Sequence, residues 1–234
     1  MTQVSFLRHN QFFGPEDSQE TTLNIIGVGA TGSWVGLLAA KMGWHKFKVW
    51  DPDFVESHNC SNQIYDVSQV GMKKVDAFEQ VLKRFNPQVI VEKHHSFFKG
   101  EKDCIDLQDA VFVAVDSLSA RKNIFSHLQK ALLLDLVFET KMGFTHAELN
   151  IIDPEDNDTI KNFISTLKDD NDVPESACNA RIITTLTSVV ASTLVHQLCN
   201  YYSSSRRGTT FNSYGKVLFH LPENGLTVFT NNKG

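Results

Sequence analysis

The sequence lacks cysteine pairs, long apolar runs and clusters of basic residues. None of its four cysteines belongs to a Cys-x-x-Cys pair, so a structural zinc site is not supported. No stretch approaches the roughly 20 consecutive apolar residues that a membrane-spanning helix requires. A net charge of −5 without a basic run argues against nucleic acid as a partner, because binding to the phosphate backbone requires clustered Lys and Arg.

A secretory signal is also missing, since residues 1–14 show no basic start followed by an apolar segment. We therefore expect a cytoplasmic protein with reduced thiols that does not bind membranes. The length of 234 residues is enough for one large domain with its own core. We expect a polar N-terminal arm over residues 1–22, followed by a single domain over residues 23–234.

Short apolar runs alternate with helical patterns through the first half of the chain. The runs predict strands at Leu23–Ile26, Phe47–Trp50, Val89–Val91, Ala110–Val115 and Ala131–Val137. Small apolar or amphipathic segments predict helices at Ser33–Met42, Gly71–Phe85 and Ser119–Gln129. This alternation predicts a doubly wound α/β fold, Rossmann-like, with a mostly parallel sheet.

The C-terminal part departs from this alternation. Residues 153–181 begin with an acidic stretch, and we expect a crossover loop there. A helix is predicted over Ile182–Tyr202. The Asn-Gly pair at residues 224–225 is a strong turn signal between strands predicted at Lys216–His220 and Leu226–Thr230, so we expect a C-terminal β-hairpin.

A glycine-rich loop joins the first predicted strand to the first predicted helix. Its sequence is Gly27-Val28-Gly29-Ala30-Thr31-Gly32. Glycine is required where the backbone turns tightly and approaches a phosphate, and a helix N-terminus offers N–H groups to the anion. Asp51 ends the second predicted strand 24 positions after Gly27, close to the spacing of a carboxylate that binds ribose hydroxyls. The unit predicts an adenine-nucleotide site, and the loop alone leaves both NAD and ATP open.

Polar residues recur in a fixed order after the glycine loop. They are Asp51, Asp53, Asn59, Asn62, Gln63, then Lys74 at a predicted helix and Asp116 after a predicted strand. This order resembles the ThiF/MoeB superfamily of ubiquitin-activating-type adenylyltransferases, whose pattern includes Asp-x-Asp, Asn-x-x-Arg-Gln, a helix-opening lysine and a strand-end aspartate. The resemblance extends over roughly residues 4–202.

The resemblance implies an adenylation domain that activates the C-terminal carboxylate of a ubiquitin-like or sulfur-carrier protein, with ATP and Mg²⁺ bound. By resemblance, Asp51 holds the ribose, Lys74 neutralises phosphate charge and Asp116 holds Mg²⁺; a lone aspartate suffices for magnesium bound to phosphates. The implied nucleotide site comprises Gly27, Gly29, Ala30, Thr31, Gly32, Asp51, Asp53, Asn59, Asn62, Gln63 and Lys74.

An N-terminal arginine in this family reaches into the nucleotide site of the partner subunit. Arg8, followed by Gln11, fits the corresponding Arg-x-x-Gln pattern. The resemblance therefore implies a catalytic role for Arg8 and a homodimer.

Asn62 departs from the family pattern, because it stands where Asn-x-x-Arg-Gln carries arginine. A phosphate-contacting cation is absent at that place. One interpretation is that another cation, such as Arg8, compensates. The other is that the chain is a non-catalytic scaffold partner of an active homologue.

Cys178 precedes a Thr-Thr-x-x-x-Val-Val-Ala run that begins at Thr184. The segment resembles the one that carries the thioester cysteine in compact ubiquitin-fold-activating enzymes. A thiol at a helix N-terminus has a lowered pKa and is a better nucleophile. The resemblance implies a catalytic Cys178 and a conjugating enzyme as a further partner, whereas the alternative is a buried cysteine that acts as a small hydrophobe.

Two other functions stay open at this point. An NAD-dependent oxidoreductase would use the same glycine loop, but the sequence offers no Tyr-x-x-x-Lys pair for hydride transfer. Adenylation of a peptide or of a tRNA base carboxylate would keep the chemistry and change the substrate. The negative net charge argues against tRNA.

Overall fold

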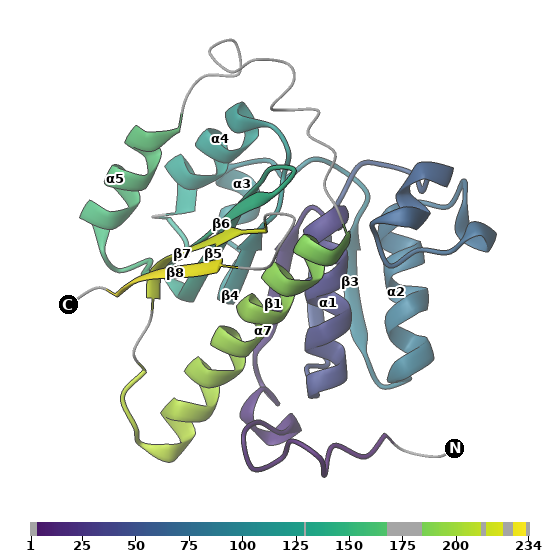
Figure 1. The fold of residues 1–234 in the computed structure, drawn as a ribbon, viewed down its shortest axis with the longest axis horizontal. Helices are drawn as coiled ribbons and strands as arrows, with labels where there is room; N and C mark the ends of the chain where they lie inside the picture. The colour runs from purple at the N-terminus through teal and green to yellow at the C-terminus, as the bar shows by residue number, and fades with distance from the viewer. Residues whose placement is uncertain (1–3, 129, 168–183, 212–213, 222–226, 233–234) are drawn as a thin grey trace.

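The structure is a computed structural model that describes residues 4–128, 130–167, 184–211, 214–221 and 227–232. Its strands form one sheet in the order β3-β2-β1-β4-β5-β6-β7-β8 (Figure 1). The strand bounds are β1 Thr22–Ile26, β2 Lys46–Trp50, β3 Ile90–His94, β4 Gln108–Val113, β5 Leu133–Met142, β6 His146–Ile152, β7 Tyr214–His220 and β8 Thr227–Asn232.

Strands β1 to β5 pair in parallel, and β6, β7 and β8 each run antiparallel to the strand before. Strand β7 therefore shares its direction with the first five strands, and β7–β8 form the predicted C-terminal hairpin. The prediction of a mostly parallel, Rossmann-like sheet is confirmed. Because β1 lies between β2 and β4, the chain winds to both sides of β1, and ligands bind such sheets at the carboxyl ends beside this switch point.

Helices cover both faces of the sheet (Figure 1). Helices α1, α2 and α7 share a buried cluster with Ile25 of β1, while α3, α4 and α5 share the opposite cluster with Ile26. Among the described helices, none combines the length and apolar character needed to span a bilayer. The helix bounds are α1 Ala30–Met42, α2 Lys74–Phe85, α3 Glu101–Cys104, α4 Leu118–Leu128, α5 Asn157–Thr166 and α7 Thr184–Arg207.

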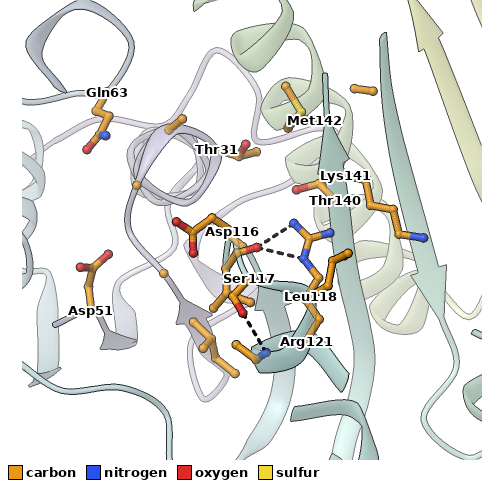
Figure 2. Close-up of a pocket in the computed structure, with 18 of the residues that line it drawn as sticks. Thr31, Asp51, Gln63, Asp116, Ser117, Leu118, Arg121, Thr140, Lys141 and Met142 are labelled. Carbon is orange, nitrogen blue, oxygen red and sulfur yellow. Dashed lines mark hydrogen bonds between the residues drawn. The ribbon is translucent and has the colours of Figure 1, made fainter. Parts of the chain in front are cut away.

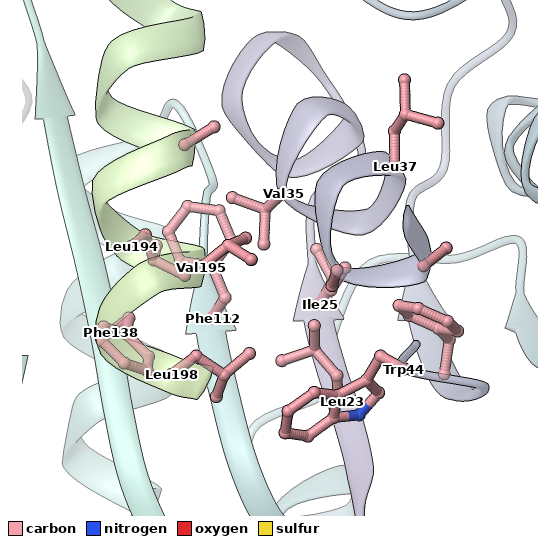
Figure 3. Packing of buried hydrophobic residues seen from close by; sticks show 14 of the residues in the cluster. Leu23, Ile25, Val35, Leu37, Trp44, Phe112, Phe138, Leu194, Val195 and Leu198 are labelled. Atoms are coloured by element: carbon pink, nitrogen blue, oxygen red, sulfur yellow. The ribbon is translucent and has the colours of Figure 1, made fainter. Parts of the chain in front are cut away.

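The packing of α1 and α7 on the sheet is shown in Figure 3. Val35 of α1 and Leu194 of α7 lie with Phe112 of β4 and Phe138 of β5, and all four side chains are fully buried. Helix α1 ends at Gly43, whose φ of +116° is the left-handed cap expected of glycine. This packing fixes the position of α1, and with it the glycine loop at the start of the helix.

Helix α3, strand β6 and helix α5 differ from the sequence-based expectation, which contains none of them. Strand β6 was not predicted, although Ala147, Leu149 and Ile151 alternate with more polar residues and are at most 3% exposed. The expected loop over residues 153–181 contains helix α5, which Asp156 caps by accepting hydrogen bonds from the first-turn N–H groups. Residues 168–183 lie outside the described residues, so the crossover loop there stays a prediction.

The N-terminal segment packs at the carboxyl end of α1. Phe13 is fully buried and stacks on Trp44 with ring centroids 5.6 Å apart. His9 Nε2 lies 3.2 Å from the carbonyl oxygen of Met42, the last residue of α1. Residues near position 9 are thereby held at the end of α1 opposite to the glycine loop.

Gly36 allows α1 to approach α2 closely. A Cβ at this position would lie 2.2 Å from Cζ of Phe78, a fully buried side chain. We predict that Gly36→Ala lowers the free energy of unfolding by about 1 kcal/mol, because overpacking costs about 1–3 kcal/mol and the better helix propensity of alanine offsets at most about 1 kcal/mol. Urea unfolding followed by circular dichroism measures the change.

The double variant Gly36→Ala with Phe78→Leu is the matched control. A smaller side chain at position 78 makes room for the added methyl group, so the two effects should be less than additive. A Gly36→Ala variant as stable as the wild type would contradict the close approach of the two helices.

Candidate active site

A cavity of about 1480 Å³ opens at the carboxyl ends of the central strands. Figure 2 shows Thr31, Asp51, Gln63 and Asp116 around this space. Of the predicted nucleotide and metal residues, those that line the cavity are Gly27, Gly29, Ala30, Thr31, Asp51, Asp53, Asn59, Asn62, Gln63, Lys74 and Asp116. The structure therefore brings together residues from segments that are far apart in the sequence.

The glycine loop leaves little room for side chains on its inner side. Gly27 has a φ of +94°, and a Cβ there would lie 2.7 Å from the carbonyl oxygen of Ala114. A Cβ on Gly32 would lie 1.9 Å from the carbonyl oxygen of Gly27. Around Gly29, by contrast, a Cβ would have no described atom within 4 Å other than those of Gly29 and its neighbours in the chain. Gly32 thus shapes the loop from behind, while Gly29 faces open space that suits a phosphate.

Helix α1 begins at the cavity with Gly29 as its N-cap, and no side chain among the described residues caps its first turn. The unpaired N–H groups of a helix N-terminus and the positive end of its dipole favour anions. Ala30 and Thr31 of this first turn line the cavity. The start of α1 is therefore suited to bind phosphate.

Asp51 fastens the glycine loop to the end of β2. Its Oδ2 accepts a hydrogen bond from the N–H of Val28 at 2.9 Å, and its Oδ1 accepts one from the N–H of Asp53 at 2.9 Å. Burial raises the pKa of Asp51 above its ordinary value, against the opposing effect of the Lys74 charge. A carboxylate accepts about four hydrogen bonds, so these two leave capacity for ribose hydroxyls.

Tyr65 also holds the loop. Its hydroxyl donates a hydrogen bond to the carbonyl oxygen of Val28 at 2.7 Å, and the residue is only 3% exposed. Burial raises the pKa of Tyr65 well above its ordinary value, with the charge of Asp51 as a second cause, so the hydroxyl stays a neutral donor. Sequence analysis missed Tyr65, because no local pattern marks a contact to a loop so far back in the chain.

Lys74 is the first residue of α2, and its ammonium lies 2.8 Å from Oδ2 of Asp53. The N–H of Lys74 also donates to the carbonyl oxygen of Asp53 at 2.9 Å. The Lys74 side chain is 9% exposed and that of Asp53 is 60% exposed, so the ammonium sits on the buried side of the pair. An ammonium has three donors, and Asp53 takes one of them.

The short 3-10 helix η2, Ser57–Ser61, presents the Asn-x-x-Asn-Gln segment. Oδ1 of Asn59 accepts a hydrogen bond from the N–H of Glu56 at 2.9 Å, which closes this turn. Oδ1 of Asn62 and Oε1 of Gln63 are buried and have no partner among the described residues. A buried oxygen without a partner costs free energy, and the donors of a bound ligand would satisfy it.

Asp116 follows β4 and lines the cavity with an exposed side chain. The preceding carbonyl oxygen, of Val115, accepts two hydrogen bonds from Arg121, from Nε at 2.9 Å and Nη2 at 2.7 Å (Figure 2). Arg121 is 8% exposed, and its Nη1 forms an ion pair with the fully buried Glu139 of β5. Burial raises the pKa of Glu139, and the charge of Arg121 counteracts that rise.

The cavity continues beyond these groups towards the β5–β6 turn and β7. This part is lined both by apolar side chains and by charged or imidazole side chains. Phe144 is 54% exposed and Leu218 is 41% exposed, so apolar surface is accessible there. The lining side chains of this part include Lys141, Met142, Phe144, His146, Glu148, Leu167, Leu218 and His220.

Of the other two residues predicted to be catalytic, Arg8 is not brought to this cavity within its own chain. Arg8 precedes His9, which contacts Met42 at the carboxyl end of α1. About 18 Å of helix separates Met42 from Ala30, so Arg8 lies away from the glycine loop of its own chain. Cys178 lies outside the described residues.

Comparison with known sequences matches residues 8–225 to the ThiF family. Ubiquitin-like modifier-activating enzyme 5 of Caenorhabditis elegans is 35% identical over 80 residues, which cover 34% of this chain and 19% of that protein. The protein of the same name from Branchiostoma floridae is 29% identical over 127 residues, which cover 47% of this chain and 30% of that protein. The matched segments thus span less than a third of these relatives' length.

Among solved structures, PaaA superposes with a TM-score of 0.72 at 18% identity, covering 94% of this chain and 67% of that chain. MccB of E. coli, solved with ATP, gives a TM-score of 0.70 at 14% identity, covering 94% of this chain and 66% of that chain. At identities this low, the superpositions establish the fold alone. The sequence match over residues 8–225 establishes more: this chain belongs to the ThiF family.

Proposed function

We propose that this chain is an ATP-dependent adenylyltransferase that activates the C-terminal carboxylate of a ubiquitin-like or sulfur-carrier protein. The observation that carries the proposal is the convergence of the α1 N-terminus, Lys74 and Asp116 on one cavity. Membership of the ThiF family and similarity to MccB, solved with ATP, support nucleotide use. The relatives named ubiquitin-like modifier-activating enzyme 5 support a protein modifier as the substrate class.

The proposed reaction begins when a carboxylate oxygen of the carrier attacks the α-phosphorus of ATP. A new oxygen–phosphorus bond forms, the bond from the α-phosphorus to the bridging oxygen breaks, and pyrophosphate leaves with the bonding electrons. Negative charge grows on the phosphate oxygens, so preorganised donors stabilise the transition state. The Lys74 ammonium and the N–H groups at the start of α1 are donors that this chain supplies.

Asp116 is the residue that we propose to hold Mg²⁺. Magnesium prefers one or two carboxylates together with phosphate oxygens and water, and the exposed Asp116 carboxylate at the cavity fits that requirement. When bound, the ion would neutralise charge on the phosphates. Asp51, at the other side of the glycine loop, would orient the ribose through its remaining acceptor capacity.

The carrier's C-terminal tail would occupy the part of the cavity between the β5–β6 turn and β7. An extended tail presents alternating side chains and a polar backbone, which suits the mixed lining described above. Phe144 and Leu218 offer apolar surface there, and Lys141 and His146 offer hydrogen-bond donors. A short peptide ending in a carboxylate would satisfy the same lining.

Lys74→Ala and Asp116→Ala are predicted to lower carrier-dependent exchange of pyrophosphate into ATP by about 100-fold or more. Lys74 would balance phosphate charge directly, and Asp116 would do so through the Mg²⁺ that it holds. The assay combines the chain, ATP, Mg²⁺, labelled pyrophosphate and small proteins or peptides encoded by neighbouring genes. Lys73→Ala is the matched control, since its side chain is exposed. It should keep exchange within about twofold of the wild type.

The same assay separates the alternatives. Absence of exchange with every candidate, together with tight binding of NAD and none of ATP, would favour an oxidoreductase. Biological function that survives both Lys74→Ala and Asp116→Ala would favour a non-catalytic scaffold partner.

We also propose that the active form is a homodimer in which Arg8 enters the cavity of the partner copy. Within one chain Arg8 lies near the carboxyl end of α1, so a second copy is required to bring it to a nucleotide. Asn62 supplies no positive charge where the family pattern has arginine. An arginine from the partner would supply a cation instead.

Mixing Arg8→Ala and Lys74→Ala chains tests this arrangement. Each variant alone should be inactive, because every site lacks one group. Random assembly makes about half of the dimers mixed, and one of their two sites is complete, so co-expression should restore about a quarter of wild-type exchange. Wild-type activity of Arg8→Ala alone, or no restoration in a confirmed mixed dimer, would contradict the role in trans.

Thioester transfer to Cys178 is the final part of the proposal. The thiolate would attack the acyl carbon of the adenylate, a carbon–sulfur bond would form, and AMP would leave. The described residues on either side of the segment with Cys178 support this step, because both lie near the nucleotide-site residues. Leu167 lines the cavity, and Oγ1 of Thr184 donates to the carbonyl oxygen of Ser61 at 2.6 Å. A conjugating enzyme would then accept the carrier.

Cys178→Ala is predicted to keep pyrophosphate exchange and to lose a carrier adduct that thiols cleave, because adenylation precedes the sulfur chemistry. Electrophoresis without reducing agent detects the adduct. Cys60→Ala is the matched control, as Cys60 is a free, partly exposed cysteine. An adduct that persists in Cys178→Ala and disappears in Cys60→Ala would assign the thioester to Cys60 and contradict the proposed role of Cys178.

A further inference from the structure

We propose that Arg121 is a positioning residue. It orients the Asp116 carboxylate by donating two hydrogen bonds to the carbonyl oxygen of the preceding residue, Val115. This inference rests on the proposed function, because it assumes that Asp116 serves a complex of Mg²⁺ and ATP. No position in the sequence motifs discussed above includes Arg121, Glu139 or Asn150. The three residues come from α4, β5 and β6 and are joined by hydrogen bonds through Glu139, and Arg121 itself lines the cavity.

The guanidinium of Arg121 donates to one oxygen from two directions. Nε and Nη2 lie 2.9 Å and 2.7 Å from the carbonyl oxygen of Val115 (Figure 2). The carbonyl of Val115 and the N–H of Asp116 belong to the same planar peptide unit. Fixing that oxygen therefore fixes the plane from which the Asp116 side chain leaves, and limits the orientations of its carboxylate.

The other side of the guanidinium is fixed as well. Nη1 of Arg121 pairs with Oε1 of Glu139, a residue with no exposed surface. Oε2 of Glu139 accepts a hydrogen bond from Nδ2 of Asn150 at 2.7 Å. The backbone N–H of Arg121 donates to the carbonyl oxygen of Ser117 at 3.1 Å, which closes the turn from Asp116 into α4. The guanidinium thus has little freedom to move away from Val115.

The energetics favour a positioning role over a purely stabilising one. A buried ion pair loses about as much free energy by desolvation as it gains by attraction, and apolar side chains of similar volume often stabilise a fold equally well. An apolar side chain at position 121 would leave the carbonyl of Val115 without its two donors. Only arginine can donate two hydrogen bonds from one planar guanidinium to that carbonyl oxygen.

Arg121→Lys is the decisive variant, because lysine keeps the charge and loses the planar guanidinium. Calorimetric titration of the full chain with ATP, once in Mg²⁺ and once in EDTA, measures how far magnesium tightens binding. We expect the variant to lose about tenfold or more of that tightening while its affinity in EDTA stays within about twofold, since outer contacts of a metal ligand typically contribute 10- to 100-fold. Glu139→Gln, which keeps the shape of the side chain, should lose part of the tightening.

Ile124→Val is the matched structural control. Ile124 belongs to the same helix, is 2% exposed and faces the cluster shared by α3, α4 and α5. It should lower stability without changing the effect of magnesium on ATP affinity. If Arg121→Lys does not fold, Glu139→Gln carries the test alone.

The outcomes distinguish the positioning role of Arg121 from the proposed function. Wild-type protein that binds ATP no better with Mg²⁺ than with EDTA would overturn the proposed function. Wild-type protein with the expected tightening, and variants at positions 121 and 139 that keep all of it, would overturn the positioning role while leaving the proposed function in place.

Discussion

The hydrogen bond from the N–H of Val28 to the Asp51 carboxylate ties the glycine loop to the end of β2. The observed loop conformation requires glycine at positions 27 and 32, because a Cβ at either position would clash with a backbone carbonyl oxygen. That shape sets where α1 begins and aims its first N–H groups at the cavity. The positions of the phosphate and ribose groups in the proposed mechanism follow from this constraint.

Buried ionisable groups recur behind the segments that carry the site. Burial raises the pKa of Asp51, Tyr65 and Glu139. Each of these groups costs free energy to desolvate, and each is joined to a backbone group or a charge that fixes a loop: Asp51 and Tyr65 act on the glycine loop, and Glu139 acts on the loop before α4 through Arg121. These buried polar groups therefore maintain the geometry of the cavity more than they stabilise the hydrophobic core.

Local patterns sufficed for the glycine loop and for the described strands other than β6, because hydrophobic periodicity and glycine spacing report on contacts nearby in the chain. Local patterns alone did not assign Lys74 and Asp116 to the nucleotide site. That prediction rested on the resemblance to a family. The contacts of Tyr65 with Val28 and of Arg121 with Glu139 join residues distant in sequence, and no periodicity encodes them. Helix α5 was missed because acidic composition outweighed the Ile160 and Phe163 spacing that buries its inner side.

The charge balance of the cavity gives the departure at Asn62 a physical consequence. The lysines and arginines that line it among the described residues are Lys74, Lys141 and Arg121, and each already faces a carboxylate. The start of α1 adds about half an elementary charge. Among the described residues of one chain, a triphosphate would therefore meet little uncompensated positive charge. If Arg8 of a second copy enters as proposed, dimer formation supplies the charge that arginine at position 62 would otherwise provide, and ATP binding becomes coupled to assembly.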